Sequence, residues 1–198
     1  MKRPTLEKGL IQVYTGSGKG KTTASLGLAL RASGHGFKTF IIQFMKGNAY
    51  YGELFALQRM YPQIQIAQYG RNCPHDPLIR QGEMKCLGCM KCFVQKGKAE
   101  EQDLLIAQKA LAKAKEVLQS EEFDLVILDE LSNAIYFELI TVEESLQLLD
   151  LKPDHVEIVI TGRNAPPEIV ERAHLVTETK EVKHPYQIGL ASRRGIEY

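Results

Sequence analysis

The stretch that decides the fold is Gly16-Ser17-Gly18-Lys19-Gly20-Lys21-Thr22-Thr23, which follows the apolar run GLIQVY at 9–14 and opens a helical pattern at 22–33. A glycine-rich turn between a buried strand and a helix is the context of a phosphate-binding loop. Its glycines let backbone N–H groups point into one concavity, and the helix N-terminus adds positive partial charge. Lys21 would neutralise phosphate and the Thr22 hydroxyl would reach Mg²⁺. We therefore expect residues 16–23 to bind a nucleoside triphosphate.

The loop departs from the standard pattern G-x-x-x-x-G-K-[ST] at one position. The pattern places glycine at the residue that is Thr15 in this chain. A glycine-rich strand-to-helix turn without a ligand is the alternative. It leaves the sequence Gly-Lys-Thr-Thr after a buried strand unexplained.

Three further apolar runs indicate buried strands at 38–44, 123–129 and 156–161. Helical patterns separate them, at 22–33, at 100–119 and from Pro166 or Pro167 onward. We expect these helices to bury Leu26, Ala29, Leu30, Leu104, Ala107, Leu111 and Leu118. Alternation of strands and helices predicts an α/β fold with a mainly parallel sheet flanked by helices, of the P-loop, RecA-like type. A length of 198 residues favours one domain, 1–198.

The charge balance argues against a nucleic-acid or lipid partner and favours small molecules. The chain has 25 basic and 24 acidic residues, a formal net charge of +1. No apolar stretch approaches the roughly 20 residues that a membrane span requires. The opening residues MKRPTLEKG lack the apolar core of a signal peptide. We expect a cytoplasmic protein.

Two carboxylates end the strand predicted at 123–129. Asp129 and Glu130 follow Leu-Val-Ile-Leu, so they lie at the carboxyl end of a central strand, where ligands bind in open α/β sheets. Such a Walker-B-like pair would hold Mg²⁺ together with Thr22. The alternative is an acidic pair that only caps the next helix.

Four cysteines lie in an irregular segment at about 70–98, and they are Cys73, Cys86, Cys89 and Cys92. Two consecutive C-x2-C steps bring thiolates close enough to share one ion. The spacing favours an iron–sulfur cluster or Zn²⁺. Free thiols and a disulfide are the alternatives, the disulfide being disfavoured in a reducing compartment.

Several motifs together resemble one family, the ATP:corrinoid adenosyltransferases with a modified phosphate loop. The resemblance lies in 14–23, in Gln43-Phe44-Met45-Lys46-Gly47, in 126–131, in 159–166, and above all in the C-terminal 178–186 and Gly195-Ile196-Glu197-Tyr198. It covers nearly the whole chain, with an interruption at 70–92. There, relatives carry an aromatic segment thought to close over the corrinoid, and Tyr69 and Phe93 are the aromatic residues available.

The resemblance implies transfer of the 5′-deoxyadenosyl group of ATP to Co(I) of a corrinoid, with triphosphate leaving. Co(I) is itself the nucleophile, so no side-chain nucleophile is required. The resemblance assigns catalysis to Lys21, Thr22 and Glu130, Mg²⁺ to Thr22, Asp129 and Glu130, and ATP to the loop 16–23. Arg163 would approach the nucleotide or corrinoid, and His184 the corrinoid side chains. For both residues, the alternative is a structural role in a turn.

The resemblance further implies a homodimer. An electron donor would reduce Co(II) to Co(I), and an iron–sulfur cluster at the cysteines is one candidate for this donor. Two other functions are open: a small-molecule kinase or NTPase using the same loop, and a carrier of corrinoid or nucleotide without catalysis. Preference for complete cobalamin or a precursor is open as well.

Overall fold

The protein, seen in a computed structural model that describes residues 5–47 and 50–198, is built on a six-stranded parallel sheet. The strand order is β3-β2-β4-β5-β1-β6, and every pairing between neighbours is parallel. The strands are β1 (Ile11–Thr15), β2 (Thr39–Phe44), β3 (Ile64–Tyr69), β4 (Leu125–Asp129), β5 (Glu157–Thr161) and β6 (Leu175–Glu178). The α/β fold with a parallel sheet is therefore confirmed.

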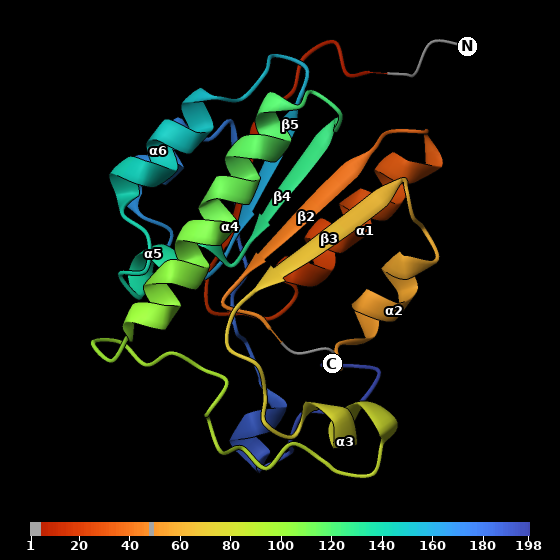
Figure 1. Ribbon diagram of the computed structural model, residues 1–198, viewed down its shortest axis with the longest axis vertical. Helices are drawn as coiled ribbons and strands as arrows, with labels where there is room; N and C mark the ends of the chain where they lie inside the picture. The colour runs from red at the N-terminus through yellow and green to blue at the C-terminus, as the bar shows by residue number, and fades with distance from the viewer. Residues whose placement is uncertain (1–4, 48–49) are drawn as a thin grey trace.

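Helices cover both faces of the sheet (Figure 1). They are α1 (Lys21–Gly34), α2 (Gly52–Gln58), α3 (Asp76–Gln81), α4 (Glu101–Gln119), α5 (Leu131–Tyr136), α6 (Val142–Asp150) and α7 (Pro167–Arg172), with a 3₁₀ turn η1 (Pro185–Ile188). The larger core joins one face of the sheet to α4, α5, α6 and α7. The smaller core joins the other face to α1 and α2.

The strands expected from apolar runs are the buried ones. All residues of β2 and β4 are buried, as a two-sided parallel sheet requires. The two strands without such a signal, β3 and β6, lie at the edges of the sheet. β6 is fully exposed and β3 alternates apolar and polar residues, so neither forms a continuous apolar run.

Two side chains expected in the core are exposed. Leu30 on α1 is 59% exposed and Leu104 on α4 is 42% exposed. The buried side of α1 instead carries Lys21, Ser25 and Ala29, because the helix begins at the phosphate loop and turns its first residue inward. Asp103 takes the buried place beside Leu104, where it pairs with the Arg71 guanidinium.

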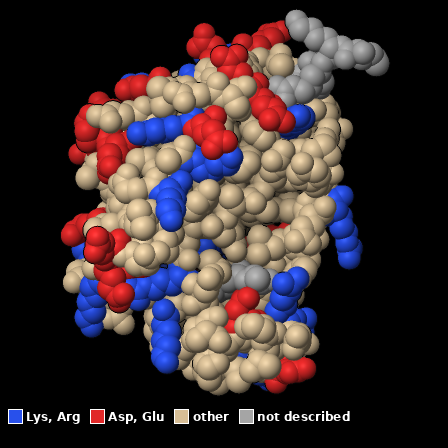
Figure 2. All heavy atoms as spheres, in the orientation of Figure 1, with Lys and Arg blue, Asp and Glu red and all other residues tan. Residues whose placement is uncertain are grey.

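The carboxyl ends of the strands converge on one end of the molecule. Beyond that end lie α3, the irregular segment before α4 and the C-terminal tail, which run side by side in Figure 1. The face shown in Figure 2 carries both acidic and basic side chains around a broad uncharged area. No helix of the described residues combines the length and apolarity needed to cross a membrane. The expectation that the opening residues MKRPTLEKG are no signal peptide falls partly on residues 1–4, which lie outside the described residues.

Candidate active site

The phosphate loop joins β1 to α1 through glycines whose backbone conformation other residues rarely adopt. Gly16 has φ +99° and Gly20 has φ +105°, both in the left-handed region that side chains avoid. Gly20 stands at the N-cap of α1, so the first N–H groups of the helix face the loop. The Lys21 ammonium donates to the carbonyl oxygens of Gly16 at 2.8 Å and Gly18 at 2.7 Å. Burial lowers the pKa of Lys21, although the charge of Glu130 opposes this shift.

The chain after β6 braces the loop from outside. The Gly18 N–H donates to the Thr179 carbonyl at 2.9 Å. The Thr179 hydroxyl donates within 3.0 Å of the carbonyl oxygens of Thr15 and Gly18. A Cβ on Gly16 would lie 2.3 Å from the Thr179 oxygen. The first part of the C-terminal motif therefore holds the phosphate loop in shape.

Asp129 at the end of β4 is the centre of a buried hydrogen-bond network. Its Oδ1 accepts from the hydroxyls of Thr22 at 2.8 Å and Thr161 at 2.7 Å. Its Oδ2 accepts from the Gln43 amide at 3.0 Å and the Lys46 ammonium at 2.8 Å. Burial alone would raise the pKa of Asp129, but the Lys46 ammonium and the threonine hydroxyls hold it below its ordinary value.

Lys46 belongs to one of the motifs quoted from the sequence, but the sequence alone assigned no role to it. It follows β2, whose Gln43 pairs in register with Asp129. Its Nζ lies 3.4 Å from Thr22 Oγ1 and 2.8 Å from Asp129 Oδ2. The ammonium thus contacts both the hydroxyl and the carboxylate proposed for Mg²⁺, which also bind each other. Burial would lower the pKa of Lys46, but Asp129 raises it above the ordinary value, so the cation is stable there.

Glu130 differs from Asp129 because it lines two surface cavities that Asp129 does not line. Its backbone is left-handed, with φ +65°, a strained conformation for glutamate that is common at functional sites. Its Oε2 accepts a hydrogen bond from the Asn133 amide. Burial, followed by the charge of Asp129, raises the pKa of Glu130 above its ordinary value. The Glu130 carboxyl group therefore takes up a proton at a higher pH than an ordinary glutamate does.

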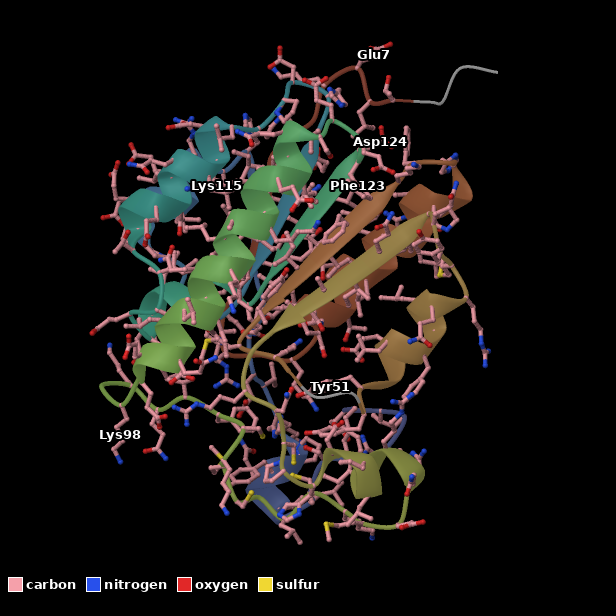
Figure 3. The ribbon with its side chains drawn as sticks, in the orientation of Figure 1. Glu7, Tyr51, Lys98, Lys115, Phe123 and Asp124 are labelled. Carbon is pink, nitrogen blue, oxygen red and sulfur yellow. The ribbon has the colours of Figure 1, made fainter. Side chains whose placement is uncertain are left out.

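Two cavities meet at these residues. The first, of about 750 Å³, is lined by the loop from Gly18 to Thr23 and by Lys46, Tyr51, Glu130, Asn133, Arg163 and Gly195 to Tyr198. The second, of about 530 Å³, is lined mainly by apolar and aromatic side chains, with Phe44, Met45, Phe93, Val94, Tyr136 and Phe137 among them. Lys46, Tyr51, Glu130, Asn133 and Arg163 line both. Figure 3 shows Tyr51 at this end of the sheet, opposite the end that carries Phe123 and Asp124.

The remaining expected site residues divide between the site and its surroundings. Arg163 lines both cavities, and its backbone N–H donates to the Asn133 amide oxygen at 2.8 Å. Gly16 and Ser17 are not among the residues that line either cavity, although the Gly16 carbonyl binds Lys21. His184 does not line them either. Its Nδ1 accepts from the Tyr186 N–H at 3.1 Å, which is the turn role given as the alternative.

The end of the C-terminal motif closes the first cavity. The Lys19 ammonium lies 3.2 Å from Glu197 Oε1, and Arg193 binds the same carboxylate. Tyr198 packs edge-on against Tyr50 with ring centroids 5.4 Å apart. The tail therefore connects the phosphate loop with the segment that carries the cysteines.

The four cysteines are not gathered into a ready metal site. Cys73 and Cys92 are buried together with Ile79, whereas Cys86 and Cys89 are exposed. Within the described part of the chain, no three side chains among His, Cys, Asp and Glu are placed to hold one metal ion. Of the two aromatic residues expected near the corrinoid, Phe93 lines the second cavity, whereas Tyr69 packs against the larger core.

Comparison with known proteins matches residues 7–198 to the family described as ATP:corrinoid adenosyltransferase BtuR/CobO/CobP. A corrinoid adenosyltransferase of a Sinorhizobium species is 35% identical over 100% of this chain and 84% of its own length. That of Escherichia coli K12 is 33% identical over 97% of this chain and 87% of its own. The crystal structure of a KaiC-like protein from Pyrococcus horikoshii OT3 superposes with a TM-score of 0.51 at 13% identity, covering 89% of this chain and 75% of that one. This last likeness concerns the fold alone.

Proposed function

The chain belongs to the ATP:corrinoid adenosyltransferase family, and we propose that its two adjoining cavities hold the two substrates of adenosyl transfer. The first cavity, with the loop amides and Lys21, takes the triphosphate of ATP. The second, with its aromatic walls, takes the corrinoid face that carries cobalt. The observation that carries this assignment is the shared border of Lys46, Glu130 and Arg163. A border common to both cavities is where C5′ of ATP would meet the cobalt.

The reaction needs a leaving-group site more than a nucleophile from the protein. Co(I) of the substrate donates an electron pair to C5′, a cobalt–carbon bond forms, and the C5′–O5′ electrons depart with triphosphate. Negative charge therefore grows on the oxygen that joins ribose to phosphate. Lys21 and the N-terminus of α1 stabilise that charge because they are fixed before the reaction begins. Arg163 at the border supplies a further positive charge.

The residues near the loop suit Mg²⁺. This ion prefers one or two carboxylates together with phosphate oxygens, and Thr22, Glu130 and Asp129 offer a hydroxyl and two carboxylates. Asp129 already accepts four hydrogen bonds, so it would hold Thr22 in place. Glu130 would be the carboxylate that holds the ion. When bound, Mg²⁺ supplies positive charge to the triphosphate.

Lys46 takes part in the same charge balance. Its ammonium contacts both Thr22 and Asp129, so it already supplies positive charge to the atoms proposed to hold a cation. Lys46 also lines both cavities. We assign Lys46 to the nucleotide phosphates.

The proposal also covers the setting of the enzyme. A homodimer, a location in the cytoplasm and an electron donor that reduces Co(II) are parts of it, drawn from the resemblance to the family. Light scattering of the purified chain tests the dimer. A mass of one chain at micromolar concentration would remove it from the proposal.

The test is formation of a light-sensitive adenosylated corrinoid from ATP, Mg²⁺ and chemically reduced cobalamin. Wild-type protein should give the spectral change, and Lys21→Ala should reduce its rate at least about 100-fold, as loss of a preorganised charge does. Lys152→Ala, far from both cavities, is the matched control. Absence of the adenosylated product with wild-type protein would contradict the proposal.

A further inference from the structure

A long irregular segment lies between α3 and α4 with little to hold it. Residues 82–100 contain no helix or strand, and Leu87, Met90 and Phe93 in it are 63%, 51% and 49% exposed. Its own core consists of Cys73, Ile79 and Cys92, with Tyr50, Met84 and Tyr198 packed against them. So few apolar side chains do not fix a segment of this length, and small units of this kind are held by metals or cross-links.

The cysteines occupy the positions that such a cross-link would join. Cys73 precedes α3 and Cys92 lies within the irregular segment, yet both thiols lie buried in one cluster. The Tyr50 side chain packs against this cluster of Cys73 and Cys92. Cys86 and Cys89 precede the buried Cys92 by six and three residues in the sequence.

The local backbone suits thiolate ligands. The His75 N–H donates to Cys73 Sγ at 3.4 Å, and such N–H donors stabilise metal-bound sulfur. Gly88 and Met90, on either side of Cys89, have φ of +63° and +58°. Left-handed residues turn the chain sharply, which allows Cys86, Cys89 and Cys92 to approach one centre. Met90 adopts this conformation at the cost of strain that a non-glycine residue rarely bears.

The charges of the segment complement a metal bound by four thiolates. Zn²⁺ with four thiolates carries two net negative charges, and an iron–sulfur cluster with four thiolates is also anionic. The segment 83–98 contains four lysines and one acidic residue, namely Lys85, Lys91, Lys96, Lys98 and Glu83. Two of the lysines directly precede Cys86 and Cys92. These lysines offset the negative charge of a metal centre with four thiolate ligands.

We propose that Cys73, Cys86, Cys89 and Cys92 ligate one thiophilic metal centre, either Zn²⁺ or an iron–sulfur cluster, that closes the segment 73–92. Cys73 and Cys92 provide the buried half, and the exposed Cys86 and Cys89 turn inward to complete it. Each ligating thiol loses its proton to solvent, so binding weakens as the pH falls. Because Cys92 and Phe93 line the second cavity, the centre fixes one wall of the proposed corrinoid site.

The first measurement is the metal content of the full-length protein purified without oxygen. One equivalent of zinc, or iron and sulfide with visible absorption, supports the centre and identifies its type. Protein isolated without metal is titrated with Zn²⁺ alone against a chromophoric chelator. One equivalent bound, with four thiols protected from a thiol reagent, supports the proposal. No stoichiometric binding, or a disulfide among these cysteines, overturns it.

The second measurement compares variants at exposed positions, where folding is unaffected. Cys86→Ser and Cys89→Ser should each weaken Zn²⁺ binding at least about tenfold, because each removes a ligand. Leu87→Ala, an exposed residue between them, should bind Zn²⁺ as the wild type does. Thermal unfolding of each variant without metal verifies the fold. Equal affinity in the cysteine variants and the wild type overturns the proposal. Neither measurement depends on adenosyl transfer, so the two proposals succeed or fail separately.

Discussion

At the scale of single residues, the site depends on one buried carboxylate whose charge is balanced within the protein. Asp129 is fully buried and its carboxylate is paired with Lys46. Breaking a buried pair from one side leaves an uncompensated charge, which costs more than the pair contributes. This asymmetry separates a structural function of Lys46 from a function in nucleotide binding.

Lys46→Met should lower the free energy of unfolding by about 3 kcal/mol, because it leaves Asp129 buried and unpaired. The double variant Lys46→Met/Asp129→Asn should recover most of this loss while ATP binding stays weak. Urea unfolding and nucleotide titration measure the two effects. Lys38→Met, which breaks the more exposed pair with Glu122, is the control and should cost less than about 1 kcal/mol. Normal ATP affinity in the double variant would remove Lys46 from the nucleotide site.

The depressed pKa of Asp129 gives a second test of the same pair. A carboxyl whose folded pKa lies below its unfolded value of about 3.9 stabilises the fold above that pH. That contribution disappears as the pH falls through the folded pKa. The stability difference between wild type and the single variant Asp129→Asn should therefore shrink as the pH is lowered from about 5 toward 2. A difference that stays constant over this range would show that Asp129 is not held ionised.

Glu130, whose pKa is shifted in the opposite direction to that of Asp129, should make the Mg²⁺ dependence of turnover sensitive to pH. Its folded pKa is raised, so protons compete with Mg²⁺ at a higher pH than for an ordinary glutamate. The Mg²⁺ concentration for half-maximal turnover should rise as the pH is lowered toward that pKa. Glu130→Gln should abolish this dependence and reduce turnover at least about tenfold. Glu143→Gln, on the exposed start of α6, should leave both unchanged.

At the scale of elements, the phosphate loop is shaped by a segment far away in the sequence. A Cβ on Gly18 would lie 2.8 Å from the backbone of Lys180, so the loop and the chain after β6 fit only with glycine. Gly27, in the middle of α1, has no atom within 4 Å of its would-be Cβ. A side chain would therefore clash at Gly18 but has open space at Gly27.

Gly18→Ala should weaken ATP binding at least about tenfold, because the loop must shift by tenths of an ångström and its amides lose their aim. Gly27→Ala should leave binding unchanged and stabilise the fold by about 0.5–1 kcal/mol, since alanine is the better helix former. Calorimetric titration and thermal unfolding measure both. Equal binding by the two variants would show that the brace from the chain after β6 does not shape the loop.

Sequence patterns revealed elements that carry a local signal and missed those that depend on pairing. The loop after β1 and the acids at the end of β4 adjoin strands that apolar runs indicate, and β4 is fully buried whereas β1 is partly buried. Lys46 reaches Asp129 only because β2 pairs beside β4, and Thr179 reaches Gly18 only because β6 pairs beside β1. Such contacts join residues that share no local pattern. His184 is a motif residue whose Nδ1 accepts a hydrogen bond within its own turn, and its place at the corrinoid stays a prediction.

At the scale of the whole molecule, the parallel sheet places both cavities at the carboxyl ends of β1, β2, β4 and β5. Residues 195–198 of the tail line the first cavity, and residues 92–94 of the cysteine segment line the second. Figure 1 shows both segments beyond this end of the sheet. Chemistry at their border requires that the phosphate loop retain the leaving group while C5′ faces the aromatic cavity. In an ordinary phosphotransferase the same loop would present the γ-phosphorus to an acceptor. The two arrangements break different bonds of ATP.

The measurement that tests this most directly follows the γ-phosphate of radiolabelled ATP during a reaction with reduced cobalamin and Mg²⁺. Adenosyl transfer predicts that the label appears in inorganic triphosphate, in equal amount to a light-sensitive adenosylated cobalamin. Label in inorganic phosphate or in a phosphorylated acceptor, with ADP accumulating and no adenosylated cobalamin, would contradict the account.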